Sequence, residues 1–177
     1  KTIQGGQIVK KKGIQPWISD SNNDYFRKYK TRLQNNLGLQ AVEKLEQSTN
    51  QILHSLTPNP NTRHSEKNKR EEQFKCYGLV VGYIQSGKTA NMLGLISRAL
   101  DAGYKNIFIL AGLIEKLRQQ TFERLERDLI SHDKPDFKLG TDSDKDYFGE
   151  TNPQNFFRTS HDPTITVVKK NKFVLNK

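Results

Sequence analysis

A short segment, residues 82–89, constrains the fold of this chain more than any other feature of its sequence. It follows an apolar run at residues 76–82 and precedes an amphipathic segment from residue 88 to about residue 102. It matches the pattern G-x-x-x-x-G-K-[ST] at every fixed position, which Gly82, Gly87, Lys88 and Thr89 occupy. A glycine-containing loop between a buried strand and a helix is typical of parallel α/β sheets. We therefore expect a strand, a loop and a helix in this order.

The residue types in this segment suit the binding of phosphate groups. In such a loop consecutive backbone N–H groups surround phosphate oxygens, and the following helix adds the positive end of its dipole. Lys88 is expected to reach the β- and γ-phosphates of ATP and Thr89 to bind Mg²⁺ through its hydroxyl, so both are expected to be catalytic. The expected nucleotide contacts are Gly82, Gln85, Ser86, Gly87, Lys88, Thr89 and Ala90. The alternative is a strand-to-helix turn that binds no nucleotide.

The composition changes twice along the chain and indicates three parts. Residues 1–57 form a helical N-terminal extension, with amphipathic helices expected at about 24–37 and 39–56 because apolar residues recur there every three or four positions. Residues 58–74 contain almost no apolar residue and predict a polar linker. Residues 75–177 alternate between strand and helix patterns, which predicts a fold of the α/β class with a parallel sheet flanked by helices. Together with the motif at residues 82–89, this predicts the first part of a P-loop ATPase lobe.

Within the expected lobe, further elements follow the first strand and helix. Apolar runs predict buried strands at residues 106–111 and 164–168, and a charged amphipathic pattern predicts a helix at residues 114–130. Residues 131–162 are polar and acidic, so an irregular insertion is expected there.

Hydrolysis of ATP requires a carboxylate that a buried strand delivers to Mg²⁺, and the apolar runs here lack one. They end in Ala111 and Gly112 and in Lys169 and Lys170. Since the chain also begins with Lys1, we expect a fragment that is truncated before the acidic Walker B strand, and that binds ATP without hydrolysing it alone. The alternative is a loop that binds nucleotide without hydrolysis in the intact protein.

The charge and composition bear on partners and compartment. The formal net charge is +10, from 29 Lys and Arg against 19 Asp and Glu, which suits attraction to nucleic acid; a solvated basic surface with no partner is the alternative. No apolar run reaches the roughly 18 residues of a membrane span, so no membrane partner is expected. A single cysteine, Cys76, and the absence of a signal-peptide pattern suit a cytoplasmic protein.

Three motifs carry a resemblance to a known family. They are VVG-x-x-QSGKTAN at residues 80–91, D-x-GY at residues 101–104, and AG-x-x-x-x-LR-x-QT-x-x-RL at residues 111–125. With these motifs, residues 78–125 resemble the Z-one domain family of proposed endonucleases, which is similar to the superfamily 2 helicase-like ATPases. The resemblance implies that residues 75–177 are the first part of a RecA-like lobe. Downstream, VVKKNKFVL at residues 167–175 is similar to the strand just before that family's acidic motif.

The resemblance implies an ATP-dependent, DNA-directed hydrolase of a bacterial restriction or phage-defence (antiviral) endonuclease system. Its partners would be DNA, a second ATPase lobe of the same parent chain and other defence-system proteins. By analogy with superfamily 2, the helix at residues 114–130 would contact a nucleic-acid backbone. The candidates for this contact are Arg118, Gln119, Gln120, Thr121 and Arg124. The alternative is a solvated helix face supported by pairs four residues apart.

Two other classes of function share the loop. A nucleotide or small-molecule kinase would also carry it, but such kinases usually have an arginine-rich lid, which we do not find in this sequence. A nucleotide-sensing interaction module would use the helices before residue 58 to recruit a partner, with the nucleotide stabilising the fold.

Overall fold

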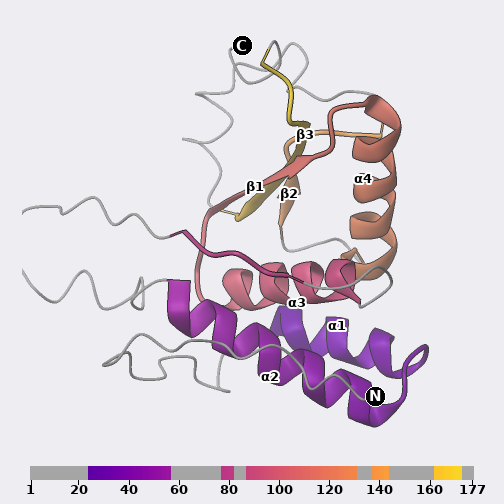
Figure 1. Cartoon of the computed structure of the whole chain (residues 1–177), viewed down its shortest axis with the longest axis vertical. Helices are drawn as coiled ribbons and strands as arrows, with labels where there is room; N and C mark the ends of the chain where they lie inside the picture. The colour runs from indigo at the N-terminus through magenta and orange to yellow at the C-terminus, as the bar shows by residue number, and fades with distance from the viewer. Residues whose placement is uncertain (1–23, 57–76, 82–86, 131–136, 144–161, 173–177) are drawn as a thin grey trace, which may run out of the picture. The chain divides into compact units, whose positions relative to one another are not determined.

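The computed structural model describes residues 24–56, 77–81, 87–130, 137–143 and 162–172 (Figure 1). The chain divides into two compact units, Lys1–Ala102 and Gly103–Lys177. The described residues of the first unit form three helices, and those of the second form a parallel sheet with one long helix. The two units are described separately below.

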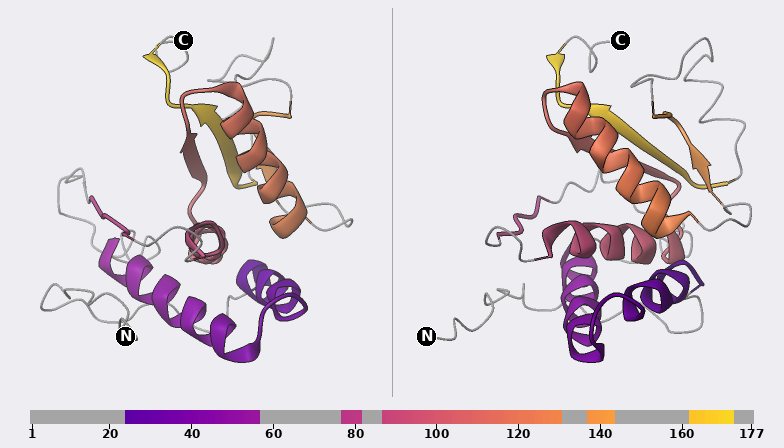
Figure 2. Two further views of the ribbon diagram at one scale, coloured as in Figure 1. Left: turned by 45° about the vertical axis from the view of Figure 1, so that its right-hand side comes forward. Right: turned by 90° about the vertical axis from the view of Figure 1, so that its right-hand side faces the viewer.

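The first unit is built from helices α1 (Asp24–Gln34), α2 (Leu39–Leu56) and α3 (Lys88–Asp101). Helices α1 and α2 both pack against α3 and also contact each other, as Figure 2 shows from two sides. Their apolar faces form the core of this unit: Phe26, Tyr29, Val42, Leu45, Leu53, Leu93, Ile96 and Leu100. The spacing of these residues at three and four positions is the amphipathic pattern that predicted the helices, so these predictions are confirmed.

Helix α2 continues through three consecutive polar residues, Ser48, Thr49 and Asn50. Polar side chains of this kind can end a helix, because they compete for backbone hydrogen bonds. Instead α2 is continuous, and the Thr49 hydroxyl donates to the Glu46 carbonyl oxygen at 3.0 Å. Thr49 is fully buried, so its methyl group contributes to the packing of α2.

A partly buried polar cluster joins the three helices. The guanidinium of Arg98, which is fully buried in α3, donates to Glu46 Oε1 at 2.9 Å and lies 3.9 Å from the centre of the Phe26 ring. Lys30 of α1 donates to the other oxygen of Glu46 at 2.6 Å. Glu46 of α2 therefore bridges cations from α1 and α3.

A carboxylate at the end of α3 also holds the beginning of α1. Asp101 accepts the backbone N–H of Tyr25 at 2.9 Å and that of Phe26 at 3.0 Å. The N–H groups in the first turn of a helix have no partner within the helix, so Asp101 satisfies two of them from another element. Burial raises the pKa of Asp101 above its ordinary value, although these two hydrogen bonds act in the opposite direction.

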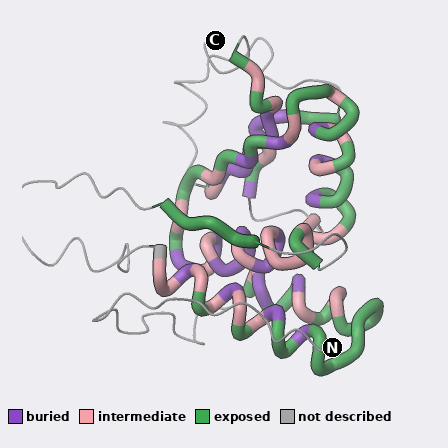
Figure 3. The backbone as a smooth tube through the Cα atoms, viewed as in Figure 1, coloured by how far each residue is buried: buried purple, intermediate pink, exposed green. Residues whose placement is uncertain are grey.

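The second unit contains strands β1 (Asn106–Ala111), β2 (Lys138–Leu139) and β3 (Thr164–Lys169) and helix α4 (Glu115–Leu129). The strands are parallel in the order β1-β3-β2. The central strand β3 is buried over Thr164–Val168, and α4 packs on β1 and β3 (Figures 2 and 3). The core of this unit is Ile109, Ala111, Phe122, Leu125, Phe137, Ile165, Val167 and Val168.

The expected irregular insertion at residues 131–162 contributes a short strand to this sheet. Its residues 137–143 contain β2, in which Lys138 is in register with Thr164 of β3. The Thr141 hydroxyl then accepts the backbone N–H of Val167 at 3.0 Å and continues the contact with β3 beyond the strand. Residues 131–136 and 144–161 lie outside the described residues.

A buried strand was expected at residues 76–82, before the loop, and the structure describes no strand there. Residues 77–81 have no regular secondary structure, and Tyr77 and Leu79 are 91% and 87% exposed (Figure 3). Cys76 and Gly82 lie outside the described residues. A strand forms only when a neighbouring strand accepts its hydrogen bonds, and the pairs between described strands are β1 with β3 and β2 with β3. The described chain is thus mixed α/β, with three helices in the first unit and a small open parallel sheet with one helix packed on it in the second.

Candidate functional site

The second half of the motif at residues 82–89 lies at the beginning of α3. Gly82, Gln85 and Ser86 are outside the described residues, whereas Gly87, Lys88, Thr89 and Ala90 are described. Gly87 precedes the helix with φ 78° and ψ 19°, which is the left-handed region. A side chain at this position would have open space, so the backbone conformation alone makes glycine the favoured residue.

The first turn of α3 has the features of an anion-binding terminus. The Asn91 N–H donates to the Gly87 carbonyl oxygen at 2.9 Å and closes this turn, and the turn contains no acidic residue. Lys88 is exposed at its beginning, and Thr89 is half-buried. Backbone N–H groups at a helix N-terminus and a lysine together attract phosphate oxygens.

These residues fit a phosphate chain better than they fit a complete metal site. Gly87 and Lys88 have the geometry and charge that phosphate oxygens require, and Thr89 supplies one hydroxyl for Mg²⁺. The second ligand expected for Mg²⁺ is a carboxylate at a strand end, but β1 ends at Ala111 and β3 at Lys169. The described residues also contain no group of three or more His, Cys, Asp or Glu side chains that could hold a metal ion.

Helices α1 and α2 each form a hydrogen bond with the first turn of α3. The Tyr29 hydroxyl of α1 donates to the Ala90 carbonyl oxygen at 2.9 Å. The Asn91 side-chain amide donates to the Ser48 hydroxyl of α2 at 2.8 Å. These two contacts fall on the residues that follow Thr89 directly, a placement that the sequence pattern did not predict.

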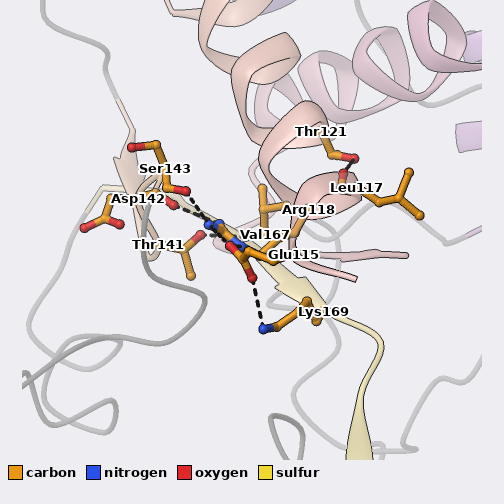
Figure 4. Close-up of polar contacts among 9 residues, drawn as sticks. All are labelled: Glu115, Leu117, Arg118, Thr121, Thr141, Asp142, Ser143, Val167 and Lys169. Atoms are coloured by element: carbon orange, nitrogen blue, oxygen red, sulfur yellow. Dashed lines mark hydrogen bonds and ion pairs between the residues drawn. The ribbon is translucent and has the colours of Figure 1, made fainter. Parts of the chain in front are cut away.

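The structure places Arg118, one of the candidates on α4, in the interior of the second unit. This side chain is fully buried in α4, and Figure 4 shows its guanidinium directed at Glu115 and at the backbone of residues 142–143. It donates to Glu115 Oε1 at 2.7 Å, to the Asp142 carbonyl oxygen at 2.8 Å and to the Ser143 carbonyl oxygen at 2.6 Å. With its donors directed inward, Arg118 is not accessible to a nucleic-acid phosphate in this structure.

The other four candidates on α4 differ in exposure. Gln120 and Arg124 are exposed, whereas Gln119 and Thr121 are half-buried. The Thr121 hydroxyl donates to the Leu117 carbonyl oxygen at 2.8 Å within the helix. Helix α4 carries as many acidic as basic residues, so its surface is not a basic patch. Gln120 and Arg124 are therefore the exposed members of the candidate set on α4.

Sequence reasoning missed the polar cluster that Arg118 forms. Glu115 lies three residues before Arg118 on α4, and its other oxygen is 3.0 Å from the Lys169 Nζ at the end of β3. The hydrogen bond from Arg118 lowers the pKa of Glu115 below its ordinary value, and Lys169 acts in the same direction against burial. The i,i+3 spacing of Glu115 and Arg118 was a signal in the sequence for this pair, but the carbonyl acceptors had none.

Comparisons with known proteins add no relationship. No protein-family model, no curated protein and no solved structure matches this chain. None of the helices that the structure describes is both long and apolar enough to span a membrane.

Proposed function

We propose that this chain is the ATP-binding part of a DNA-directed, helicase-like ATPase, and that ATP binds at residues 82–89. The observation that carries the proposal is the complete G-x-x-x-x-G-K-[ST] match, in which Gly87 has the left-handed conformation and α3 begins at Lys88. The parallel three-stranded sheet of the second unit, on which α4 packs, is compatible with it.

Each residue at the beginning of α3 has a role in this proposal. Gly87 lets the backbone turn so that the N–H groups of the first turn face the phosphates. Lys88 would neutralise charge on the β- and γ-phosphates, and Thr89 would hold Mg²⁺, which when bound stabilises the charge that develops on phosphate oxygens. Because β1 and β3 end in Ala111 and Lys169, we expect this chain alone to bind MgATP without turnover.

The DNA-directed part of the proposal rests on the resemblance to the Z-one domain family and on the net charge of +10. On α4, Gln120 and Arg124 are the residues proposed to contact a phosphate backbone. A role in a restriction or phage-defence endonuclease system follows from the same resemblance.

The test is MgATP binding to the complete 177-residue chain by titration calorimetry. We expect Lys88→Ala to abolish measurable binding while circular dichroism and the melting temperature stay unchanged, because Lys88 is exposed. Lys116→Ala, which removes an exposed lysine of α4, is the matched control and should bind MgATP like the parent chain. Equal affinity of the parent chain and Lys88→Ala would overturn the proposal.

DNA binding is tested separately by fluorescence anisotropy with single-stranded and duplex oligonucleotides at several salt concentrations. We expect Arg124→Ala to weaken binding and to reduce its salt dependence, since one phosphate contact is lost. A salt-dependent affinity that is identical in Arg124→Ala and the parent chain would remove α4 from the proposal and leave the ATP site unaffected.

A further inference from the structure

Helices α1 and α2 both come close to α3 at Gly94, six residues after the beginning of α3. A methyl group at Gly94 would lie 2.9 Å from Thr49 Cγ2, 3.0 Å from Leu45 Cδ2 and 3.5 Å from Tyr29 Cε1. Residues of both α1 and α2 thus occupy the space beside this glycine. The close approach brings the polar groups of these helices within hydrogen-bond distance of the first turn of α3.

Two hydrogen bonds form at this close approach, and both involve the two residues that follow Thr89. Tyr29 of α1 donates its hydroxyl to the Ala90 carbonyl oxygen at 2.9 Å, and Ser48 of α2 accepts the Asn91 amide at 2.8 Å. Tyr29 is almost fully buried, and Ser48 and Asn91 are half-buried, so water competes weakly for these groups. Each bond fixes the first turn of α3 against a different helix.

We propose that Tyr29 and Ser48 are positioning residues for the phosphate site, so that MgATP affinity and the packing of α1 and α2 on α3 depend on each other. The inference rests on the proposed function. Lys88 and Thr89 belong to the same helical turn as Ala90 and Asn91, so a turn held in one place presents their side chains and N–H groups already oriented. A site ordered before binding loses less entropy on binding, which raises affinity.

The dependence must act in both directions. If the packed arrangement binds MgATP more tightly than a loosened one, then MgATP must favour the packed arrangement by the same factor. Bound MgATP should therefore slow hydrogen exchange in α1 and α2, which carry none of the expected nucleotide contacts. A purely structural role for Tyr29 and Ser48 would change the melting temperature of the variants and leave their Kd for MgATP unchanged.

The experiment measures MgATP affinity by calorimetry for the complete chain and for Tyr29→Phe and Ser48→Ala. We expect the Kd to rise by about threefold to tenfold in each variant, as for the loss of one hydrogen bond. Ser48→Thr keeps a hydroxyl and should restore the affinity. The matched controls are Thr31→Val in α1 and Ser55→Ala in α2, whose hydroxyls donate to carbonyl oxygens of their own helices, and these should leave the Kd unchanged.

Two further readouts separate the possible outcomes. All titrations are made well below the melting temperature of the least stable variant, and hydrogen exchange of α1 and α2 is measured with and without MgATP. If Lys88→Ala loses binding while Tyr29→Phe and Ser48→Ala bind like the parent chain, the positioning role is overturned and the ATP site stands. If Lys88→Ala binds MgATP normally, the proposed function fails, and the inference fails with it.

Discussion

The helical unit and the sheet unit each enclose a fully buried arginine, and they use it differently. In the helical unit Arg98 interacts with the carboxylate of Glu46 and lies over the Phe26 ring. In the sheet unit Arg118 interacts with the carboxylate of Glu115 and with two backbone carbonyl oxygens. The first arginine joins three helices, whereas the second fixes an irregular segment to a helix.

The difference shows why a buried guanidinium is useful in both settings. Over a ring and one carboxylate, Arg98 acts mainly as a charge with an apolar stem. Arg118 uses the fork of its N–H groups, because the backbone of residues 142–143 offers acceptors in fixed positions. A lysine would keep the charge in the first case and lose the stacking of the planar guanidinium on the ring, whereas in the second case it would lose the hydrogen bonds of the fork.

The largest expected effect is the loss of either arginine. Arg98→Ala and Arg118→Ala should each destabilise their own unit by about 3 kcal/mol, because each removes a fully buried side chain together with the hydrogen bonds that it donates. Hydrogen exchange shows which unit is destabilised: protection of backbone amides should fall in α1–α3 for Arg98→Ala, and in α4 and β3 for Arg118→Ala. The lysine variants sharpen the comparison, since Arg98→Lys should be milder than Arg118→Lys. Equal losses of stability in Arg98→Lys and Arg118→Lys would contradict the distinction between an arginine that acts mainly through its charge and one that acts through several N–H donors.

The next effect concerns glycines that neighbouring side chains approach. Gly94→Ala should destabilise the helical unit by about 1–2 kcal/mol, because the new methyl group meets the buried Thr49 and Leu45. Gly112→Ala meets the side chain of Leu117, which is 44% exposed and can move, so its cost should stay below about 1 kcal/mol. Urea denaturation measures the free energy of unfolding of both variants. A larger decrease for Gly112→Ala than for Gly94→Ala would contradict the expected order.

A smaller effect is expected at the contact between α3 and α1. Asp101→Asn keeps one acceptor oxygen but places an amide group against the second N–H, so Tyr25 or Phe26 loses its partner. We expect a loss of about 1 kcal/mol, similar to that of a helix N-cap. Hydrogen exchange at the beginning of α1 measures it, with Asp24→Asn as the control. Unchanged protection of the Tyr25 and Phe26 amides would show that Asp101 does not hold α1.

The smallest effect is a difference in pH dependence between the units. The pKa of Glu115 is lowered by Arg118, so its contribution to stability is present above the ordinary glutamate pKa of 4.5 and is lost as pH falls through the lowered value. Burial raises the pKa of Asp101, so its contribution has the opposite sign and is lost as pH rises through the raised value. Because Glu115 is partly exposed, its contribution to the pH dependence of the free energy of unfolding should be below about 1 kcal/mol.

Carboxyl carbon chemical shifts in an NMR titration measure both pKa values directly. The Glu115→Gln variant should lose part of the acid dependence of the sheet unit and leave the helical unit unchanged. A Glu115 pKa at or above its ordinary value would contradict the expected sign.

Local sequence patterns were sufficient for most of the regular elements. The spacing of apolar residues predicted α1, α2, α3 and α4, and the apolar runs predicted β1 and β3, close to their observed bounds. These patterns succeed because the face of a helix or strand that is buried must be apolar wherever it packs. The same reasoning predicted a buried strand before the loop, where the structure has exposed residues 77–81. An apolar run shows that burial is favourable, but it does not supply the neighbouring strand.

The sequence by itself determined the helices, the strands β1 and β3, and the position of the G-x-x-x-x-G-K-[ST] motif relative to α3. The tertiary structure alone decided the partners of polar groups: Asp101 with the beginning of α1, Tyr29 with Ala90, and Arg118 with the carbonyl oxygens of residues 142–143. The reason is physical. Apolar periodicity repeats within one element and can be read locally, whereas a hydrogen bond depends on two groups that the fold brings together from distant positions. Backbone carbonyl oxygens, moreover, are present at every residue and leave no mark in the sequence.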